Sequence, residues 1–315
     1  MKILFVEPPK DFWFVMGDYM PPPFGILALA GYLESKNKSW EIEIVDCQAE
    51  KLDWDGLEKR IAAARANVVA PSGLATSNAY MAVRTVELAK KVNPETKTVV
   101  GGQHFTALAE ESLKDYAEID FVVRGEGEQT LGELINALEE NNQPMKIKGL
   151  SFRHDGKIVH TPERPHIENL DVLPPPAYHL VKEHMKRYYF SLMAEKNAPF
   201  AIVEGSRGCS HNCSYCSQWR FWNRCHRLKS PKRIAAEFER LHSEYGSKFF
   251  WLADDNFRVD QRASEICDEL IDRGISGDVA WFCQARCEDI VVNREIVPKM
   301  HKAGNVWMLV GLDSP

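Results

Sequence analysis

Three cysteines lie within a run of eight residues in the second half of the chain, as Cys209, Cys213 and Cys216. Thiolates at this spacing on one short loop can converge on a single metal centre. Ferredoxin-type iron–sulfur sites use four cysteines, and a structural zinc site completes a tetrahedron, whereas this loop supplies three thiolates. A cluster held by three thiolates leaves one iron open to bind a substrate or a cofactor.

Two other interpretations of the loop stay open. A zinc ion would take its fourth ligand from His211, Cys225 or His226, and Cys225 could equally complete a cluster. Zinc sites usually pair two Cys-x2-Cys or Cys/His arms, and no second arm follows here at that spacing. The remaining cysteines are interpreted as core residues at Cys47, Cys267 and Cys283, while Cys225 and Cys287 have no assigned role.

The cysteine loop follows a predicted strand, where a barrel or an open sheet presents a reactive centre. Apolar runs predict strands at Ala201–Glu204, Lys248–Leu252, Val279–Gln284 and Val306–Val310. Amphipathic stretches between them predict helices at Pro231–Tyr245, Arg262–Asp272 and Arg294–Lys302. This alternation is typical of a parallel sheet with crossover helices.

The first half of the chain shows the same alternation. Strands are expected at Lys2–Glu7, Glu41–Asp46, Asn67–Ala70, Thr98–Val100 and Asp120–Val123. Helices are expected at Phe24–Ser35, Trp54–Ala66, Asn78–Val92, Ala107–Asp115 and Gln129–Asn141. Five such units predict a doubly wound α/β domain over residues 1–145. Residues 146–199 read as a linker with a hairpin that turns at Asp155-Gly156, and 200–315 as the second domain.

Ligands of doubly wound sheets bind beyond the carboxyl ends of the strands. The segments that follow the predicted strands are rich in Gly, Ser and Thr, which allow close backbone approach to a ligand and offer amides and hydroxyls. Taken singly, each segment is better explained by the helix caps and tight turns that every doubly wound fold needs.

Composition narrows the classes of function. Lys and Arg number 39 against 45 Asp and Glu, so the net charge of −6 gives no basic field for a nucleic acid or an anionic membrane. No apolar run reaches the roughly 20 residues of a membrane helix, and the first residues read as a buried strand rather than a secretion signal. These features predict a folded cytoplasmic protein.

The three-cysteine loop, with the aromatic Tyr215 before its last cysteine, resembles the signature of radical S-adenosylmethionine (SAM) enzymes. In that family a [4Fe–4S] cluster binds SAM at its open iron. The resemblance implies that Cys209, Cys213 and Cys216 hold the cluster and that Tyr215 lies at the cofactor.

The rest of the chain resembles the cobalamin-dependent subgroup of these enzymes, through PPPFGILALAGYLE, VVGGQHFTALAEE, VVRGEGEQTLGEL and ENLDVLPPPAYHL. The sequence lacks the Asp-x-His-x-x-Gly motif that ligates cobalt, so cobalamin without a histidine ligand is expected, with 72–78 facing its lower side. The resemblance implies corrin contacts from Ser72, Gly73, Thr76, Ser77, Gly101, Gly102, His104, Thr106, Arg124, Gly125, Glu126 and Gly127.

Further SAM contacts are expected at the ends of the later strands. Asp254 and Asn256 could hold the ribose hydroxyls, although a helix cap explains them as well. Arg286, with Gln284 nearby, could pair with the methionine carboxylate, or form a salt bridge on the barrel rim. Asp313 stands where the family usually carries Glu, which puts its contact in doubt.

The segment CSQWRFW (216–222) is most similar to the anaerobic magnesium-protoporphyrin IX monomethyl ester cyclases, although Trp219 and Trp222 could simply pack the loop. The resemblance implies an enzyme that cleaves SAM to a 5′-deoxyadenosyl radical, with a one-electron donor such as flavodoxin or ferredoxin and a small-molecule substrate. Oxidative cyclisation, methyl transfer to another substrate, and a non-catalytic corrinoid or electron-transfer module are the alternatives. A partial radical SAM barrel of four βα units, incomplete at the C-terminus or completed by a partner, is expected.

Overall fold

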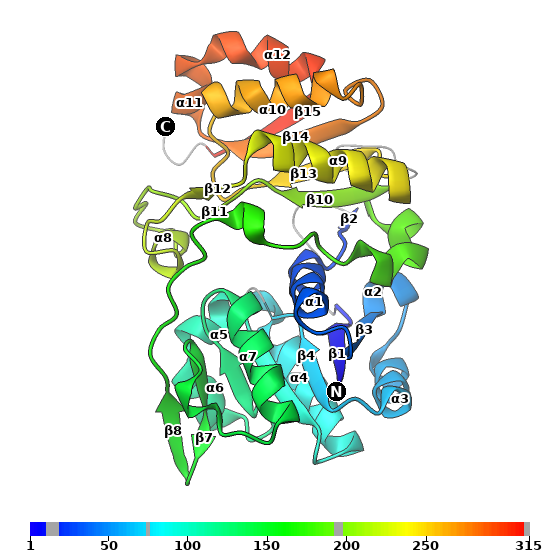
Figure 1. Ribbon diagram of the computed structural model, residues 1–315, viewed down its shortest axis with the longest axis vertical. Coiled ribbons are helices and arrows are strands. Elements are labelled where there is room, and N and C mark those ends of the chain that lie inside the picture. The colour runs from blue at the N-terminus through cyan, green and yellow to red at the C-terminus, as the bar shows by residue number, and fades with distance from the viewer. Residues whose placement is uncertain (11–18, 74–75, 192–197, 312–315) are drawn as a thin grey trace. The chain divides into compact units, whose positions relative to one another are not determined.

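The computed structural model describes residues 1–10, 19–73, 76–191 and 198–311. The chain forms two compact units (Figure 1). The described part of the first unit is 1–10, 23–73, 76–167 and Pro174–Val181, and that of the second is 19–22, Glu168–Leu173, 182–191 and 198–311. Residues 146–199 therefore contribute to both units.

The first unit is built on a sheet in the order β3-β1-β4-β5-β6-β7-β8. Its five parallel strands are β1 (Lys2–Glu7), β3 (Glu41–Asp46), β4 (Val68–Pro71), β5 (Lys97–Gly101) and β6 (Phe121–Val123). The expected hairpin forms as β7 (Leu150–His154) and β8 (Lys157–His160), and β7 pairs antiparallel with β6. The strand order reverses at β1, which confirms the doubly wound fold.

Helices connect the parallel strands of this sheet. They are α1 (Phe24–Lys36), α2 (Cys47–Glu50), α3 (Trp54–Ala64), α4 (Thr76–Val92), α5 (Gln103–Ala107), α6 (Ala109–Asp115) and α7 (Gly127–Glu139), with a 3-10 turn at Pro144–Lys146. The single helix expected at 107–115 is instead two helices, because Leu108 leaves the helical region at φ −120°. Helix α1 packs on α7, and α3 packs on α4.

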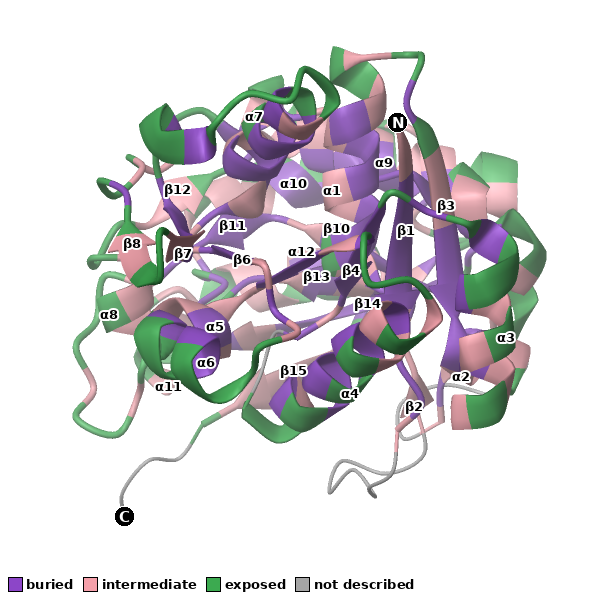
Figure 2. Cartoon of the chain, turned by 90° about the horizontal axis from the view of Figure 1, so that it is seen from below, coloured by how far each residue is buried: buried purple, intermediate pink, exposed green. Residues whose placement is uncertain are grey.

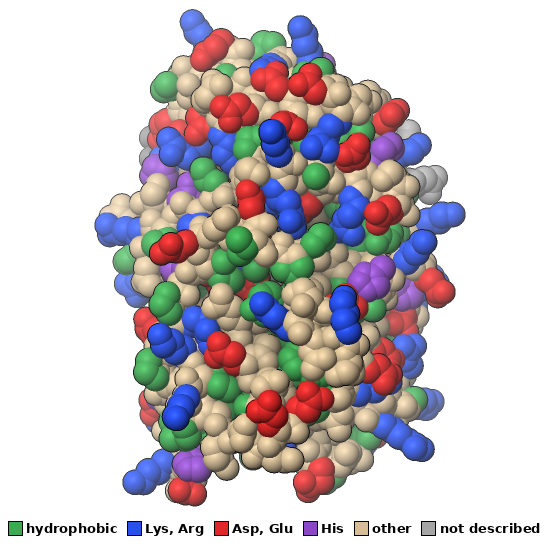
Figure 3. Space-filling model, viewed as in Figure 1, with side chains coloured by type: hydrophobic (Ala, Val, Ile, Leu, Met, Phe, Trp, Pro, Cys, Tyr) green, Lys and Arg blue, Asp and Glu red, His purple; other side chains and the backbone are tan. Residues whose placement is uncertain are grey.

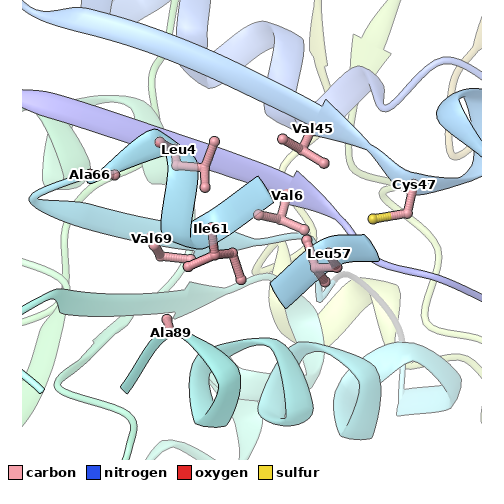
Figure 4. Packing of buried hydrophobic residues seen from close by; sticks show 10 residues of the cluster. Leu4, Val6, Val45, Cys47, Leu57, Ile61, Ala66, Val69 and Ala89 are labelled. Atoms are coloured by element: carbon pink, nitrogen blue, oxygen red, sulfur yellow. The ribbon is translucent and has the colours of Figure 1, made fainter. Parts of the chain in front are cut away.

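The core of the first unit confirms the expected apolar strands. Leu4, Val6, Val45 and Val69 on the strands meet Leu57 and Ile61 of α3 (Figure 4). Cys47 lies in the same cluster at 1% exposure, as expected for a core cysteine. Its burial raises the pKa of the thiol, which keeps it protonated and unreactive. Figure 2 shows β1 buried between its two ends, where the first and last residues are of intermediate exposure.

The second unit has a parallel sheet in the sequential order β10-β13-β14-β15, which is the strand order of a (β/α) barrel. Its strands are β10 (Phe200–Glu204), β13 (Phe249–Ala253), β14 (Ala280–Ala285) and β15 (Asn305–Val310). Its helices are α8 (Gln218–Phe221), α9 (Pro231–Tyr245), α10 (Gln261–Asp272), α11 (Cys287–Val292) and α12 (Val297–Lys302). Two-residue ladders join β2 (Tyr19–Met20) to β9 (Tyr189–Phe190) and β11 (Ser206–Arg207) to β12 (Arg227–Leu228).

Short 3-10 turns complete the described elements, at Leu170–Val172, Tyr178–Arg187 and Arg294–Ile296. Aromatic rings fill the second sheet's core, where the rings of Phe200, Phe249 and Phe282 lie within 6.5 Å of one another. Cys267 and Cys283 are buried in this unit, as expected. Among the described residues, no helix is both long enough and apolar enough to cross a bilayer.

Candidate functional site

The cysteine loop begins where β10 ends and is closed at its base by a short ladder. Ser206 pairs with Leu228 and Arg207 with Arg227, so residues 208–226 project from β11 and β12. A further bond from Lys229 N to Gly205 O, at 2.9 Å, continues this closure toward the sheet. The ladder therefore fixes both ends of the loop at the carboxyl edge of the second sheet (Figure 1).

Two glycines allow the chain to enter the loop. Gly208 has φ +88°, and a Cβ there would lie 2.0 Å from the Cys225 carbonyl oxygen. Its amide donates to Asp255 Oδ2 at 3.0 Å. At Gly205 a Cβ would lie 2.5 Å from Asp254 Oδ1. Side chains at either position would displace the loop from the two aspartates.

The three cysteines of the loop are free thiols of intermediate exposure. Cys216 N donates to Cys213 O at 3.1 Å, and the Trp219 indole Nε1 donates to the same oxygen at 3.1 Å. Burial raises the pKa of the Cys209 thiol. Trp219 therefore packs under the turn that presents Cys213 and Cys216, in agreement with the packing role expected for it, while Tyr215 is 68% exposed.

The spacing of the cysteines bears on the kind of metal centre. In the ranges that the structure describes, no three His, Cys, Asp or Glu side chains converge closely enough to hold a single metal ion. An iron–sulfur cluster binds each thiolate to a different iron, so its ligands stand farther apart than the ligands of one zinc ion. The donor set of three thiolates fits a [4Fe–4S] cluster with one open iron.

Asp254 is a buried carboxylate at the carboxyl end of β13. Its side chain is fully buried, and neither oxygen has a hydrogen-bond partner of good geometry among the described residues. Burial raises its pKa to about 6, against the opposing effects of Arg262, 3.9 Å away, and of Ser206. The alternative role as a helix cap does not hold, because Asp260 caps α10 by accepting from Arg262 N and Ala263 N.

The other expected SAM contacts are distributed around this edge. Asn256 is 5% exposed beside Asp254, and Phe257 N donates to the Gln284 carbonyl at 2.9 Å, which joins the ends of β13 and β14. Arg286 donates to Glu288 at 3.0 Å and also lies against the Cys213 thiol, and both contacts raise its pKa. Asp313 lies outside the described residues.

The expected corrin contacts lie on the loops at the carboxyl edge of the first sheet. Thr106 Oγ1 accepts from Gly125 N at 3.0 Å, which joins the loops after β5 and β6. His104 Nδ1 lies 3.1 Å from Thr76 Oγ1, at the start of α4. Gly102, at φ +93°, precedes α5 and allows this turn. These hydroxyls, backbone amides and an imidazole suit the amide-rich rim of a corrin.

Several of the expected corrin residues also make contacts within the first unit. Arg124 donates to the carbonyls of Leu150 and Thr161, and Glu126 accepts from Ile167 N at 2.8 Å. Both side chains therefore brace the segment that follows β6. Gly73 and Gly101 are packing positions, where a Cβ would lie 2.6 Å from the Phe105 ring and 3.1 Å from Val123 O. Of the other expected corrin residues, Ser72 follows β4, Ser77 lies in the first turn of α4, and Gly127 begins α7.

Sequence reasoning assigned no role to Arg262, which organises the base of the cysteine loop. Arg262 of α10 donates to Gly205 O at 2.6 Å and to Lys229 O at 3.2 Å, at the base of the cysteine loop. Asp255 holds Gly208, as described above. Glu7, at the end of β1, is desolvated beside Asp46, and burial raises its pKa. Glu7 and Asp255 lie in the strand-end segments where ligands are expected, whereas Arg262 lies at the start of a helix, where no pattern marked it.

Family models match the two halves of the chain. The B12 binding domain matches residues 17–135, and the Radical SAM superfamily matches residues 203–315. The second match contains the cysteine loop and the carboxyl ends of β10, β13 and β14. The first contains the loops after β4, β5 and β6.

Curated relatives cover both halves together. The chain is 33% identical over 321 residues to anaerobic magnesium-protoporphyrin IX monomethyl ester cyclase of Rubrivivax gelatinosus, which covers 100% of this chain and 56% of that protein. It is 32% identical to an uncharacterised methyltransferase of Pyrococcus horikoshii, over 100% of this chain and 66% of that protein. Hopanoid C-3 methylase of Methylococcus capsulatus is 28% identical over 93% of this chain and 53% of that protein. The chain thus spans about half to two thirds of these relatives.

Two solved structures share the fold over 99% of this chain. The radical SAM methyltransferase TsrM of Kitasatospora setae, with cobalamin and a [4Fe–4S] cluster bound, has a TM-score of 0.76, 17% identity and 59% of its length covered. The cobalamin-dependent SAM radical enzyme OxsB, with aqua-cobalamin bound, has a TM-score of 0.78, 18% identity and 44% of its length covered. With both domain families matched in one chain, the protein belongs to the cobalamin-dependent radical SAM enzymes, whose cofactors are a [4Fe–4S] cluster, SAM and cobalamin.

Proposed function

We propose that this chain carries the SAM-cleaving and corrin-binding parts of an enzyme that cyclises or methylates an organic substrate. The observation that carries the proposal is the three-cysteine loop fixed at the carboxyl edge of the second sheet, beside the buried Asp254. When bound, the cluster and SAM would supply a 5′-deoxyadenosyl radical that abstracts a substrate hydrogen, and cobalamin would supply a methyl group or a redox centre.

The residues around the loop have distinct tasks in this proposal. Cys209, Cys213 and Cys216 would hold three irons, and the Trp219 indole fixes the turn that carries two of these thiolates. Asp254 would accept hydrogen bonds from the ribose hydroxyls of SAM, because both its oxygens are buried with no partner of good geometry in the described ranges. Arg286 would bind the methionine carboxylate or stabilise the Cys213 thiolate.

Anaerobic reconstitution with iron and sulfide, followed by SAM and a chemical reductant, tests SAM cleavage. The chain should form 5′-deoxyadenosine, and Cys213→Ala should lower the yield at least about 100-fold because the cluster loses a ligand. Cys225→Ala is the matched control, since it changes another cysteine of the same loop and should keep the yield within about twofold. Bound corrinoid and iron without 5′-deoxyadenosine would instead favour a non-catalytic module.

Oxidative cyclisation of a magnesium-porphyrin is the first candidate reaction, because a cyclase is 33% identical across the whole chain. Methyl transfer is the second, because a methyltransferase is 32% identical across the whole chain. The two reactions are distinguished by incubating the chain with magnesium-protoporphyrin IX monomethyl ester and with SAM that carries a deuterated methyl group. A cyclised product free of deuterium supports the first candidate, and recovery of unchanged porphyrin overturns it for this substrate.

A further inference from the structure

The segment that carries the cysteine loop is strongly basic, although the chain as a whole has a net charge of −6. Between Glu204 and Glu237 the sequence has seven Lys and Arg residues and no Asp or Glu. The buried cations of this segment are neutralised from outside it. Arg207 pairs with Glu204 at 2.9 Å, and Lys229 lies 3.3 Å from Glu237. Arg233 also pairs with Glu237, at 2.7 Å. The other cations of the segment are Arg227 on β12, the exposed Lys232 on α9, and two exposed arginines on α8 and the turn after it.

Arg220 and Arg224 are both exposed, and both lie on the ring of Trp219. Their guanidinium carbons are 5.1 and 5.3 Å from the ring centroid. Neither forms an ion pair with a carboxylate in the part of the chain that the structure describes. We call Trp219, Arg220 and Arg224 the arginine patch. Figure 3 shows Lys and Arg side chains on the edge where Figure 1 places α8.

Nearby carboxylates do not compensate the arginine patch. Asp255 accepts from Gly208 N, and Glu288 pairs with Arg286. Two exposed guanidinium groups held on one ring repel each other, so an anionic partner gains more from them than from two separated cations. The patch therefore fits a negatively charged partner surface.

The arginine patch is also joined directly to the predicted cluster ligands. Trp219 Nε1 donates to the carbonyl oxygen of Cys213, at 3.1 Å. A partner bound on the patch is consequently separated from the turn of Cys213 and Cys216 by one side chain. This is the position that a redox partner needs, because the proposed reaction consumes one electron from outside the chain.

We propose that the arginine patch docks an acidic one-electron carrier protein that reduces the cluster. This inference rests on the proposed function. In the transfer one electron would pass from the reduced carrier, which is oxidised, to the oxidised cluster held by the three cysteines, and no atom would be exchanged. The opposite charges of patch and carrier accelerate encounter and orient the carrier.

Charge reversal tests the docking surface. The double variant Arg220→Glu/Arg224→Glu is compared with Arg294→Glu/Lys302→Glu, which reverses two exposed cations at the other end of the same unit and changes the net charge equally. Reduced flavodoxin is the carrier, and stopped-flow bleaching of the reconstituted cluster gives the reduction rate. Binding of oxidised flavodoxin to the cluster-free chain, followed by biolayer interferometry, gives a second readout.

At about 50 mM salt the patch variant should be reduced by flavodoxin at least about tenfold more slowly than wild type, and its binding should weaken by a similar factor. The difference should shrink to about twofold at 0.5 M salt, since screening removes steering. The control should stay within about twofold of wild type.

Reduction with dithionite, which needs no docking surface, distinguishes failure of the docking proposal from failure of SAM cleavage. Wild type and both variants should bind equal iron and form 5′-deoxyadenosine with dithionite. If they do, and flavodoxin reduces the patch variant as fast as wild type, the docking surface is wrong while SAM cleavage stands. If the wild type forms no 5′-deoxyadenosine with either reductant, the proposed function fails. Binding of a short RNA to the patch in preference to flavodoxin would also overturn the inference.

Discussion

Individual residues at the base of the cysteine loop hold it in place in ways that their residue type alone does not predict. Gly208 is required by sterics, because φ +88° places a Cβ 2.0 Å from a backbone oxygen. Asp255 is exposed but holds the Gly208 amide. Asp254 is buried and neither of its oxygens has a hydrogen-bond partner of good geometry among the described residues, so its negative charge lowers the free energy of unfolding. At this scale, function and stability oppose each other most clearly at Asp254.

Gly208→Ala should prevent the loop from closing. The new Cβ would contact the Cys225 carbonyl, so the chain between β11 and Cys209 must shift. We expect iron and acid-labile sulfide after reconstitution to fall at least about threefold. Gly246→Ala is the matched control, because Gly246 also has positive φ, at +69°, but a Cβ there meets nothing within 4 Å. Equal iron loading of the two variants would contradict the steric argument.

Asp254→Asn should change how stability depends on pH. The pKa of Asp254 is raised from 3.8 to about 6 by burial, so the folded chain binds its proton more tightly than the unfolded chain. This contribution to stability is present below about pH 4, is lost as pH rises through about 6, and amounts to about 3 kcal/mol. Between pH 4 and 7, wild type should therefore lose about that much more unfolding free energy than the variant.

Urea unfolding of the metal-free chain at several pH values measures this difference. Asp278→Asn, at an exposed position of the same unit, should run parallel to wild type. The Asp254→Asn variant should also bind SAM more weakly after reconstitution, because the amide replaces one acceptor oxygen by a donor. Parallel pH profiles for wild type and Asp254→Asn would show that the carboxylate stays charged in the folded chain.

At the scale of elements, the apolar strands were predictable and the short ladders were not. β1 coincides with its expected range because a buried parallel strand is a continuous apolar run. β3, at the edge of the sheet, coincides through its alternation of Glu with Ile. Helix α9 also matches, since Ser230 caps it and Gly246 ends it. The ladder of β11 and β12 has two residues a side, which is too short for any hydrophobic period. The part of the site that positions the cysteines was therefore invisible in the sequence, whereas the cysteines themselves were not.

Arg262→Met should loosen the base of the cysteine loop without removing helix α10. The guanidinium donates to Gly205 O and Lys229 O, the residues that flank the ladder, and methionine keeps the apolar stem. We expect the unfolding free energy to fall by about 2 kcal/mol and limited proteolysis to cut within 208–226. Arg273→Met, at the half-buried residue that caps the end of α10 and pairs with Glu239 and Glu269, should cost less than about 1 kcal/mol. Identical proteolysis of both variants would show that Arg262 does not hold the base of the cysteine loop.

At the scale of the whole molecule, each unit has its own core and its own candidate site. The first unit packs its apolar residues around β1, and the second packs aromatic rings around β10, β13 and β14. The candidate corrin residues lie in the first unit and the cysteines in the second. Units with separate cores respond separately to local substitutions, so binding of the two cofactors should be separable by mutation.

Thr106→Val should reduce corrinoid binding and leave iron binding unchanged. The Thr106 hydroxyl accepts from Gly125 N, and valine, which has the same shape, leaves that amide unpaired and frees the loop after β6. We expect affinity for hydroxocobalamin to fall about tenfold, with iron per chain unaltered. Thr85→Val is the control, because its hydroxyl bonds Met81 O within α4.

Conversely, the triple Cys209→Ala/Cys213→Ala/Cys216→Ala chain should bind hydroxocobalamin as wild type does while holding no cluster. Absorbance titration and iron analysis of one sample measure both, and loss of corrinoid from the triple variant would show that the two sites are coupled rather than separate.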